Sequence, residues 1–156
     1  MLNFKSMNDC YVMAPERSAQ IALKFLDRFL PNRTPSFDPR DPGEVLGLTE
    51  EFNLKEVFEY LEIKQEVEYA MYFQNEAEAE IKNAGVFFQE DGSLFLMLSV
   101  DDSAGLADET LEEIQRAVNA VVGYWSFEEP PAADADSFRK RALKFPSSYH
   151  THQRFS

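Results

Sequence analysis

Cysteine, glycine and histidine are scarce in this chain of 156 residues, and each shortage excludes a class of chemistry. The single cysteine, Cys10, cannot form an internal disulfide, so core packing has to stabilise the fold. The six glycines do not show the spacing of a phosphate-binding loop. His150 and His152 are too few ligands for a metal site, which needs three or four. We therefore expect no cofactor and no metal ion.

Long apolar segments are also missing. The longest apolar run, residues 94–98, is far shorter than the roughly 20 residues of a membrane helix. Residues 1–15 contain neither the basic nor the apolar part of a secretory signal. The sequence predicts a cytoplasmic protein. Because both histidines are far from Cys10 in the chain, we expect this cysteine to be a small buried residue beside a strand rather than a nucleophile.

Basic residues are outnumbered, with 15 Lys and Arg against 28 Asp and Glu and a net charge of −13. An acidic surface repels phosphate, which excludes sequence-independent binding of nucleic acid and argues against anionic membranes. All the acids lie within residues 1–136, whereas residues 137–156 contain five basic residues and no acid. This basic segment either binds a partner or lies back on the acidic body and reduces its self-repulsion, and we favour the second interpretation.

The apolar content of 44% is sufficient for one hydrophobic core, and a chain of this length usually forms one domain. The Pro130-Pro131 pair predicts a boundary between an α+β domain at residues 1–130 and a basic C-terminal tail at residues 131–156. We expect the tail to contain a short helix, from Asp136 or Ser137 to Lys144, followed by a mobile end.

Hydrophobic periodicity predicts the order of the elements in the body. Strands are expected at residues 10–14, 66–74, 84–89, 93–100 and 124–129, and helices at 16–30, from Asn53, and from Asp108 to a left-handed cap at Gly123. Asp91-Gly92 predicts a tight hairpin, and the strand that follows it, apolar on both faces, should be central. The fold class is α+β, with an antiparallel or mixed sheet of about five strands and two to three helices mainly on one face.

Charged residues on the expected helices form two patterns. Arg17, Lys24 and Arg28 lie opposite the apolar stripe of the first helix, where we interpret them as a solvated face. Four acids recur at intervals of three, three and four residues along the second helix and beyond it: Glu56, Glu59, Glu62 and Glu66. This spacing predicts a row of carboxylates on the outward face of that helix.

Acids in connecting segments are interpreted as solvated. Asp101 and Asp102 follow the central strand, where neighbouring side chains point to opposite faces, so they do not form an acid–base pair. Glu76, Glu78 and Glu80 alternate with alanine and fit an exposed loop better than a cation site. Aromatic residues are abundant on the strands, and one sheet face carries Tyr72, Phe87, Phe95 and Met97. That face is either a partner, ligand or dimer surface, or it is buried beneath the tail or a connector.

The chain resembles a group of small acidic bacterial proteins in the order of its elements. The resemblance rests on Tyr11-Val-Met-Ala-Pro, a helix ending in Phe29-Leu30-Pro31, the Asp91-Gly92 hairpin leading to Leu98-Ser99-Val100-Asp101, and Glu128-Glu129-Pro130. Proteins of this group are α+β proteins of unassigned function, and some are immunity proteins that neutralise polymorphic toxins. The resemblance implies a protein-binding role but assigns no functional residue.

Two functions from different classes follow from these patterns. The first is a non-enzymatic acidic binding module, of immunity or inhibitor type, for a basic protein partner. Its expected contact residues are Glu56, Glu59, Glu62 and Glu66, with Asp101 and Asp102 added to the row. The alternative is a small enzyme or ligand-binding domain that uses the aromatic sheet face, with candidate residues Tyr72, Asp101, Tyr124 and Trp125. A homodimer formed through the sheet remains a third possibility.

Overall fold

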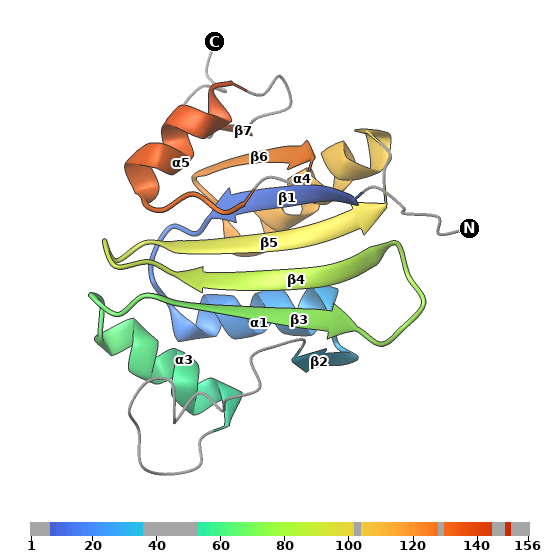
Figure 1. Ribbon diagram of the computed structural model, residues 1–156. Helices are drawn as coiled ribbons and strands as arrows, with labels where there is room; N and C mark the ends of the chain where they lie inside the picture. Colours follow the sequence, from blue (N-terminus) through green and yellow to red (C-terminus); the bar gives the residue numbers. More distant parts are fainter. Residues whose placement is uncertain (1–6, 36–52, 102–103, 128–129, 145–148, 151–156) are drawn as a thin grey trace.

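Seven antiparallel strands form one sheet in the computed structural model, in the order β2-β3-β4-β5-β1-β6-β7 (Figure 1). The structure describes residues 7–35, 53–101, 104–127, 130–144 and 149–150. The strands are β1 (Met7–Met13), β2 (Arg33–Pro35), β3 (Tyr69–Asn75), β4 (Ile81–Phe88), β5 (Leu94–Asp101), β6 (Val122–Phe127) and β7 (Tyr149–His150). The helices are α1 (Ala19–Phe29), α3 (Leu54–Ile63), α4 (Ala104–Val118) and α5 (Ala135–Ala142).

The helices cover the sheet unequally. Helices α1, α3 and α4 pack on one face, and α5 lies on the other face, which is turned toward the viewer in Figure 1. This arrangement confirms the predicted α+β class and the placement of most helices on one face. The short strands β2 and β7 at the two ends of the strand order were not predicted. Two or three residues carry too little alternation to be recognised as a strand.

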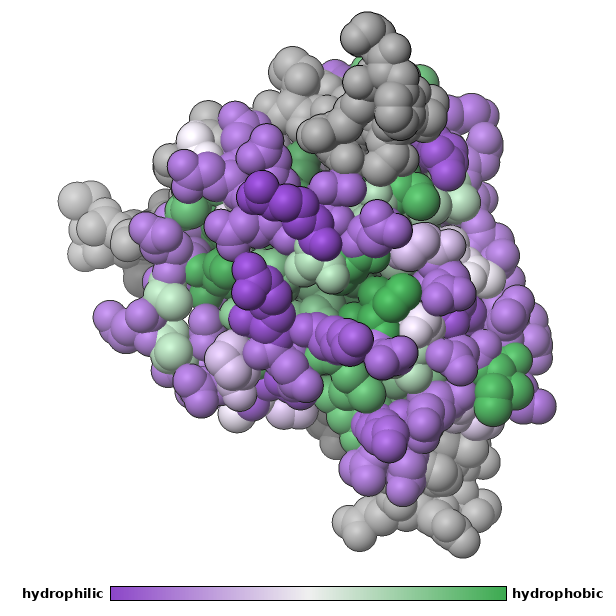
Figure 2. Space-filling model, turned by 180° about the vertical axis from the view of Figure 1, so that it is seen from behind, coloured by the Kyte–Doolittle hydropathy of each residue, from purple (hydrophilic) through white to green (hydrophobic). Residues whose placement is uncertain are grey.

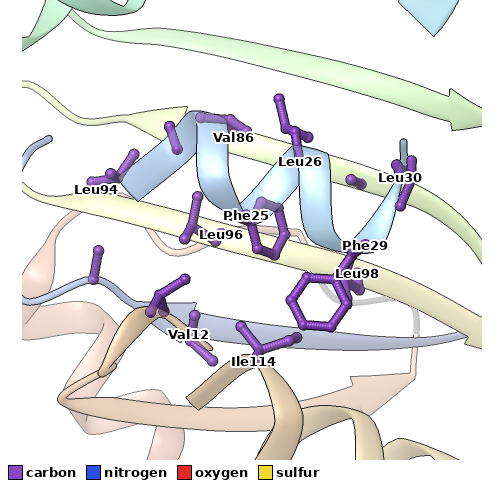
Figure 3. Close-up of a cluster of buried hydrophobic side chains, with 14 of the residues drawn as sticks. Val12, Phe25, Leu26, Phe29, Leu30, Val86, Leu94, Leu96, Leu98 and Ile114 are labelled. Atoms are coloured by element: carbon purple, nitrogen blue, oxygen red, sulfur yellow. The ribbon is translucent and has the colours of Figure 1, made fainter. Parts of the chain in front are cut away.

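The main core lies between α1 and the centre of the sheet. Phe25 and Phe29 point from α1 toward Leu96 and Leu98 of β5, and Leu26 lies toward Val86 of β4 (Figure 3). These side chains are at most 7% exposed. Strand β5 pairs with β4 on one side and β1 on the other, which confirms its predicted central position.

Polar side chains set where α1 and α3 begin, although not always where the sequence predicted. Helix α1 begins at Ala19, because the Oγ of Ser18 accepts the backbone N–H of Ile21 at 3.2 Å. The predicted start at Glu16 was therefore wrong. Asn53 caps α3 as predicted, and its Oδ1 accepts the N–H of Glu56 at 2.9 Å.

The predicted boundaries of α4 were wrong at both ends. The helix starts at Ala104, ahead of Asp108, and it ends at Val118 rather than at Gly123. The left-handed residue after the helix is Asn119, with a φ of 56°, since asparagine tolerates this conformation better than other residues with a side chain. Gly123 lies within β6 instead, where an added Cβ would come within 3.0 Å of the carbonyl oxygen of Tyr11.

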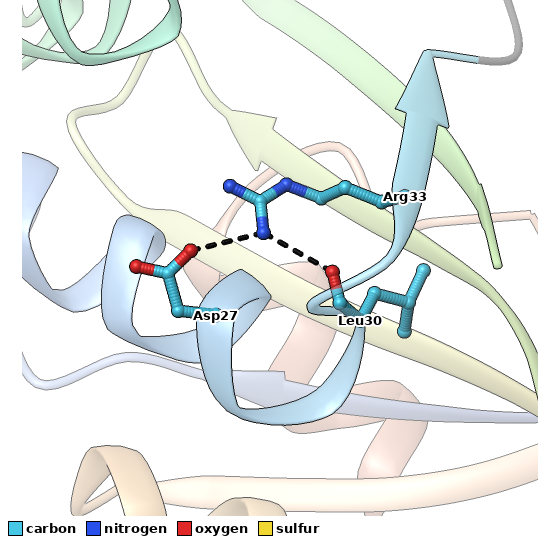
Figure 4. A network of polar contacts seen from close by, with 3 residues as sticks. All are labelled: Asp27, Leu30 and Arg33. Carbon is cyan, nitrogen blue, oxygen red and sulfur yellow. Dashed lines mark hydrogen bonds and ion pairs between the residues drawn. The ribbon is translucent and has the colours of Figure 1, made fainter. Parts of the chain in front are cut away.

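A glycine turn joins β4 to β5, and hydrogen bonds from Arg33 anchor the edge of the sheet at β2. Gly92 has a φ of 91° in the β4–β5 hairpin, which explains the predicted Asp91-Gly92 turn. At the β2 edge, Nη1 of Arg33 donates to Oδ1 of Asp27 at 2.9 Å and to the carbonyl oxygen of Leu30 at 3.1 Å (Figure 4). Arg33 therefore ties β2 to the C-terminal end of α1.

A second apolar cluster lies on the α5 side of the sheet. The ring of Phe138 on α5 lies 4.6 Å from that of Phe95 and 5.0 Å from that of Tyr124, measured between centroids. Phe138 and Ala142 are fully buried. This part of the basic C-terminal segment thus lies on the sheet through apolar contacts, and Lys140 forms its ion pair with Asp136 of the same helix, at 3.0 Å.

Candidate functional site

The side chain of Arg17 is buried, whereas Lys24 and Arg28 are exposed. The predicted solvated face of three basic residues was therefore wrong at Arg17, which is only 7% exposed. Its guanidinium donates four hydrogen bonds to backbone carbonyls: Nε to Leu61 at 2.6 Å, Nη1 to Gln89 at 2.7 Å, and Nη2 to Lys64 at 3.0 Å and Val67 at 2.7 Å. The guanidinium has five N–H donors on three nitrogens and can bind four carbonyls at once, whereas a lysine has three donors on a single nitrogen.

Arg17 joins three connecting segments at one end of the sheet. It lies between β1 and α1, and its acceptors belong to the end of α3, the α3–β3 connection and the β4–β5 hairpin. Its guanidinium also lies 5.1 Å from the ring centroid of Phe88. Burial lowers the pKa of Arg17, and the carboxylates of Glu66 and Asp91 oppose that shift, which places both acids near the guanidinium.

Carboxylates lie on the connections that Arg17 joins and at the start of α5, which Asp91 of the β4–β5 hairpin binds through Ala135. We call the set the acidic end; it consists of Glu16, Glu62, Glu66, Glu68, Glu90, Asp91 and Asp134. Glu16 precedes Arg17 in the chain, and Glu68 and Glu90 flank the register pair Tyr69–Phe88 of β3 and β4. The structure therefore gathers at one place acids that are up to 118 positions apart in the sequence.

Three members of the acidic end also have structural roles. Oε1 of Glu62 accepts the N–H of Ala19 at 2.8 Å, at the N-terminus of α1. Asp134 caps α5, and Oδ2 of Asp91 accepts the N–H of Ala135 at 2.8 Å. Burial raises the pKa of Asp91, but hydrogen bonds from Ala135 and Ser93 lower it more and hold it below its usual value.

The predicted acidic row is divided by the structure. Glu56 and Glu59 are exposed on α3, but Glu62 turns to α1, and Glu66 lies beyond the last residue of the helix, Ile63. Asp101 ends β5, and at about 3.3 Å per residue it lies roughly 23 Å from the hairpin at the start of that strand. Asp102 lies outside the described residues. Asp101 is therefore not part of the surface that contains Glu66.

Glu16, Glu68 and Glu90 were not among the contact residues predicted from the sequence. Each of these acids lies within three residues of a predicted strand end, which was the available signal. This signal was insufficient, because the order of the strands in the sheet decides which strand ends lie together, and the sequence does not give that order.

The four residues of the alternative site are not brought together. Tyr124 is fully buried under Phe138, and Trp125 faces the opposite side of the sheet, where its Nε1–H donates to Oδ1 of Asp108 at 2.7 Å. Phe87, Phe95 and Met97 are also buried, as one of the two interpretations of this face predicted. Tyr72 is the large residue of that face that remains open, with 44% of its surface exposed.

The helix face holds a shallow groove of about 560 Å³ between α1 and α4, lined by Arg28, Glu113, Arg116 and Ala117. Figure 2 shows this face with apolar side chains gathered near its centre and hydrophilic residues around them. Arg28 and Arg116 lie in the last turns of their helices, where a cation offsets the helix dipole. Their position is thus explained without a ligand.

Cys10 is fully buried, as predicted, and its Sγ donates to the carbonyl oxygen of Ala107 at 3.5 Å. Burial raises the pKa of the Cys10 thiol, and Asp9 and Asp108 raise it further, so the thiolate is scarce at pH 8. A disulfide reagent should therefore react about a hundredfold more slowly with the native protein than with the protein in urea. Absorbance of the released thiol measures both rates, and equal rates would contradict the burial of Cys10.

The described ranges offer little other chemistry. They contain no group of three or more His, Cys, Asp or Glu side chains that could hold a metal ion. Glu76, Glu78 and Glu80 are exposed on the β3–β4 connection, in agreement with the solvated loop. The side chains of His150 and His152 lie outside the described residues. None of the described helices is long and apolar enough to span a membrane.

Comparison with known proteins gives a structural similarity without a match in sequence. No family model matches the chain, and no curated protein matches it. The fold is similar to a chain of the 1.75 Å crystal structure of the toxic C-terminal tip of CdiA from Pseudomonas aeruginosa in complex with immune protein. The TM-score is 0.44 at 15% identity, and the match covers 86% of this chain and 92% of that chain. A similarity of this size is not evidence for a shared function.

Proposed function

We propose that this protein is a non-enzymatic binding module, of immunity or inhibitor type, whose acidic end binds a basic protein. The observation that carries the proposal is the gathering of six carboxylates on segments that Arg17 ties together, with Asp134 beside them at the start of α5, where Asp91 binds Ala135. A dense patch of one charge attracts an oppositely charged partner before contact and raises the rate of association.

The acidic end has exposed carboxylates on a backbone that hydrogen bonds from Arg17 hold in place. Glu16, Glu66, Glu68 and Glu90 are exposed, so their carboxylates are accessible to a partner. The carbonyls that Arg17 binds lie within one or two residues of Glu66, Glu68 and Glu90, which holds their backbone in place. A patch that is already ordered loses less conformational entropy on binding than a flexible one.

The described segments that Arg17 joins contain fewer basic than acidic side chains. The guanidinium of Arg17 is buried and bound to four carbonyls, and Lys140 is paired with Asp136. Lys64 is an exposed cation in the α3–β3 connection. The buried, protonated thiol of Cys10 further supports binding rather than nucleophilic catalysis.

A charge reversal at the acidic end should reduce capture of a basic partner. The immobilised protein is exposed to lysate of its source organism at low and at high salt, and retained proteins are identified by mass spectrometry. The variant Glu68→Lys/Glu90→Lys should retain at least about tenfold less of a basic protein that the parent retains at low salt and releases at high salt.

The matched control is Glu78→Lys/Glu80→Lys, which makes the same change in net charge on exposed residues of the β3–β4 connection, at the opposite end of the sheet (Figure 1). This control should retain the partner at close to the parental level. Equal loss in both variants would show that only the net charge matters, and equal retention by all three proteins would refute the role of the acidic end.

A further inference from the structure

A row of polar residues crosses the α5 side of the sheet around Asp9. Asp9 on β1 is the register partner of Ser99 on β5 and of Ser126 on β6, so these three side chains lie on one face. Tyr11 lies two residues further along β1 on the same face. Tyr72 on β3 lies in the same row across the sheet as Tyr11, because the register runs from Tyr11 through Met97 and Gly85 to Tyr72. We call Asp9, Tyr11, Tyr72, Ser99 and Ser126 the Asp9 cluster. It is separate from the acidic end, since none of its members belongs to the segments that Arg17 joins.

Within the Asp9 cluster, the buried hydroxyl group of Ser126 has no hydrogen-bond partner among the described residues. The Oγ of Ser99 donates to Oδ1 of Asp9 at 2.6 Å. Ser126 is only 2% exposed, and its Oγ has no hydrogen-bond partner within the described part of the chain. A buried hydroxyl without a partner is costly in an apolar site, which indicates that a polar group from outside completes the cluster.

Aromatic rings form a surface beside the carboxylate of Asp9. The ring of Phe87 lies 6.3 Å from that of Tyr11 and 5.4 Å from that of Tyr72, the second pair edge to face. Gly85 makes room for the Phe87 ring, because an added Cβ at Gly85 would come within 2.6 Å of that ring. Tyr72, at 44% exposure, connects this aromatic surface to solvent.

The negative charge of Asp9 acts on the pKa values of Tyr11 and Tyr72. Burial raises the pKa of Tyr11 and of Tyr72, and Asp9 raises both further, which places its carboxylate close to the two hydroxyls. Tyr124 also acts on Tyr11, and Arg141 of α5 acts in the opposite direction. The guanidinium of Arg141 donates to the carbonyl oxygen of Pro130 and is near enough to Tyr11 to act on its pKa.

We propose that the Asp9 cluster binds the ammonium or guanidinium group of a basic side chain. The carboxylate of Asp9 supplies the opposite charge, the hydroxyls of Ser99 and Ser126 supply acceptors, and the exposed ring of Tyr72 attracts a cation. The source of that side chain is the basic protein of the proposed function, on which this inference rests for the identity of its partner. The partner then makes two separate contacts, a broad one with the acidic end and a specific one with the Asp9 cluster.

Small probes test the Asp9 cluster without the partner. The amide signals of the ¹⁵N-labelled protein are followed by NMR during titration with N-acetyl-arginine amide and N-acetyl-lysine amide. We expect saturable shifts at Asp9, Ser99 and Ser126 for at least one of the two cations. N-acetyl-citrulline amide has nearly the shape of the arginine derivative but no charge, and it should bind at least about tenfold more weakly.

Three variants locate the binding. Asp9→Asn keeps the size and one acceptor of the side chain and should weaken cation binding about tenfold or more. Tyr72→Ala changes an exposed residue, so it should fold even if Asp9→Asn does not, and it should weaken binding about threefold or more. Glu80→Gln, the matched control, removes one exposed carboxylate outside the cluster and should leave the dissociation constant unchanged.

The outcomes separate this inference from the proposed function. Equal binding of the citrulline derivative, undiminished binding by folded Asp9→Asn, or undiminished binding by Tyr72→Ala would overturn the cation site. If no probe binds while partner capture still depends on Glu68 and Glu90, the cation site fails and the proposed function stands. If the probes bind through Asp9 while that capture does not depend on Glu68 and Glu90, the proposed function fails and the cation site stands.

Discussion

Replacement of Arg17 by alanine is expected to lower the free energy of unfolding by about 3–5 kcal/mol. The substitution removes four hydrogen bonds from a charged donor, all between 2.6 and 3.0 Å. It leaves the carbonyls of Leu61, Gln89, Lys64 and Val67 without that donor in a buried or partly buried site. The contact with the ring of Phe88 is lost as well. Equilibrium unfolding in urea, followed by circular dichroism, measures the change.

Two further variants show whether the charge or the fork of Arg17 is responsible. Arg17→Lys keeps the charge but cannot reach four carbonyls in different directions, so we expect it to recover less than half of the lost stability. Arg28→Ala removes an exposed arginine of α1 that lies 5.4 Å from the ring of Phe29, and it should cost about 1 kcal/mol or less. An Arg17→Ala protein as stable as Arg28→Ala would contradict the role of Arg17 as the joint of three segments.

Replacement of Phe138 by alanine should lower the free energy of unfolding by about 3–4 kcal/mol. The side chain of Phe138 is fully buried between Phe95 and Tyr124, and its removal leaves a cavity that the rigid sheet cannot close. The same loss should detach α5 from the sheet more often, since Phe138 and Ala142 are the buried residues of this helix. Urea unfolding gives the stability, and amide exchange of α5 gives the local opening.

The exposed neighbour Leu143 provides the matched control. It is 67% exposed, and Leu143→Ala should change stability by no more than about 0.5 kcal/mol. If Phe138→Ala also has an unchanged midpoint and slope in urea, α5 does not unfold together with the sheet, and the C-terminal helix would be an appendage rather than part of the core.

Patterns within one segment predicted most of the fold. The alternation of Tyr69, Met71 and Phe73 predicted β3, and the apolar stripe of Val57, Phe58 and Leu61 predicted α3. These predictions were correct because burial of one face imposes a period on the sequence of the element itself. The central place of β5 followed for the same reason, since a strand covered on both faces is apolar throughout.

Predictions that depended on a choice between two local solutions were less successful. Asn119 and Gly123 both suit a left-handed helix end, and glycine is the commoner residue there. The chain uses Asn119, because Val122 and Tyr124 have to face the α5 side of β6 and the strand therefore begins before Gly123. Ser18 and Glu16 offered a similar choice at the start of α1, and the hydroxyl of Ser18 caps the helix.

The candidate site was only partly predictable. The excess of acid is evident from composition, and the spacing along the second helix predicts Glu62 and Glu66 as contact residues. Glu68 is close to Glu66 in the sequence, but Glu16 and Glu90 carry no such pattern, since only the tertiary structure brings their segments to that of Glu66. Asp9, which lies at the centre of the second site, carries no sequence signal that distinguishes it from other aspartates.

By itself, the sequence determined the class of fold, the central strand, the Asp91-Gly92 turn and the net negative charge of the protein. Only the tertiary structure decided that Arg17 is buried while Arg28 is exposed, although both belong to the same predicted helix. The physical reason is that burial of a charge depends on acceptors from elsewhere in the chain, here carbonyls 44 to 72 positions away from Arg17. A periodic pattern records which face of an element is covered, but not which distant groups meet it there.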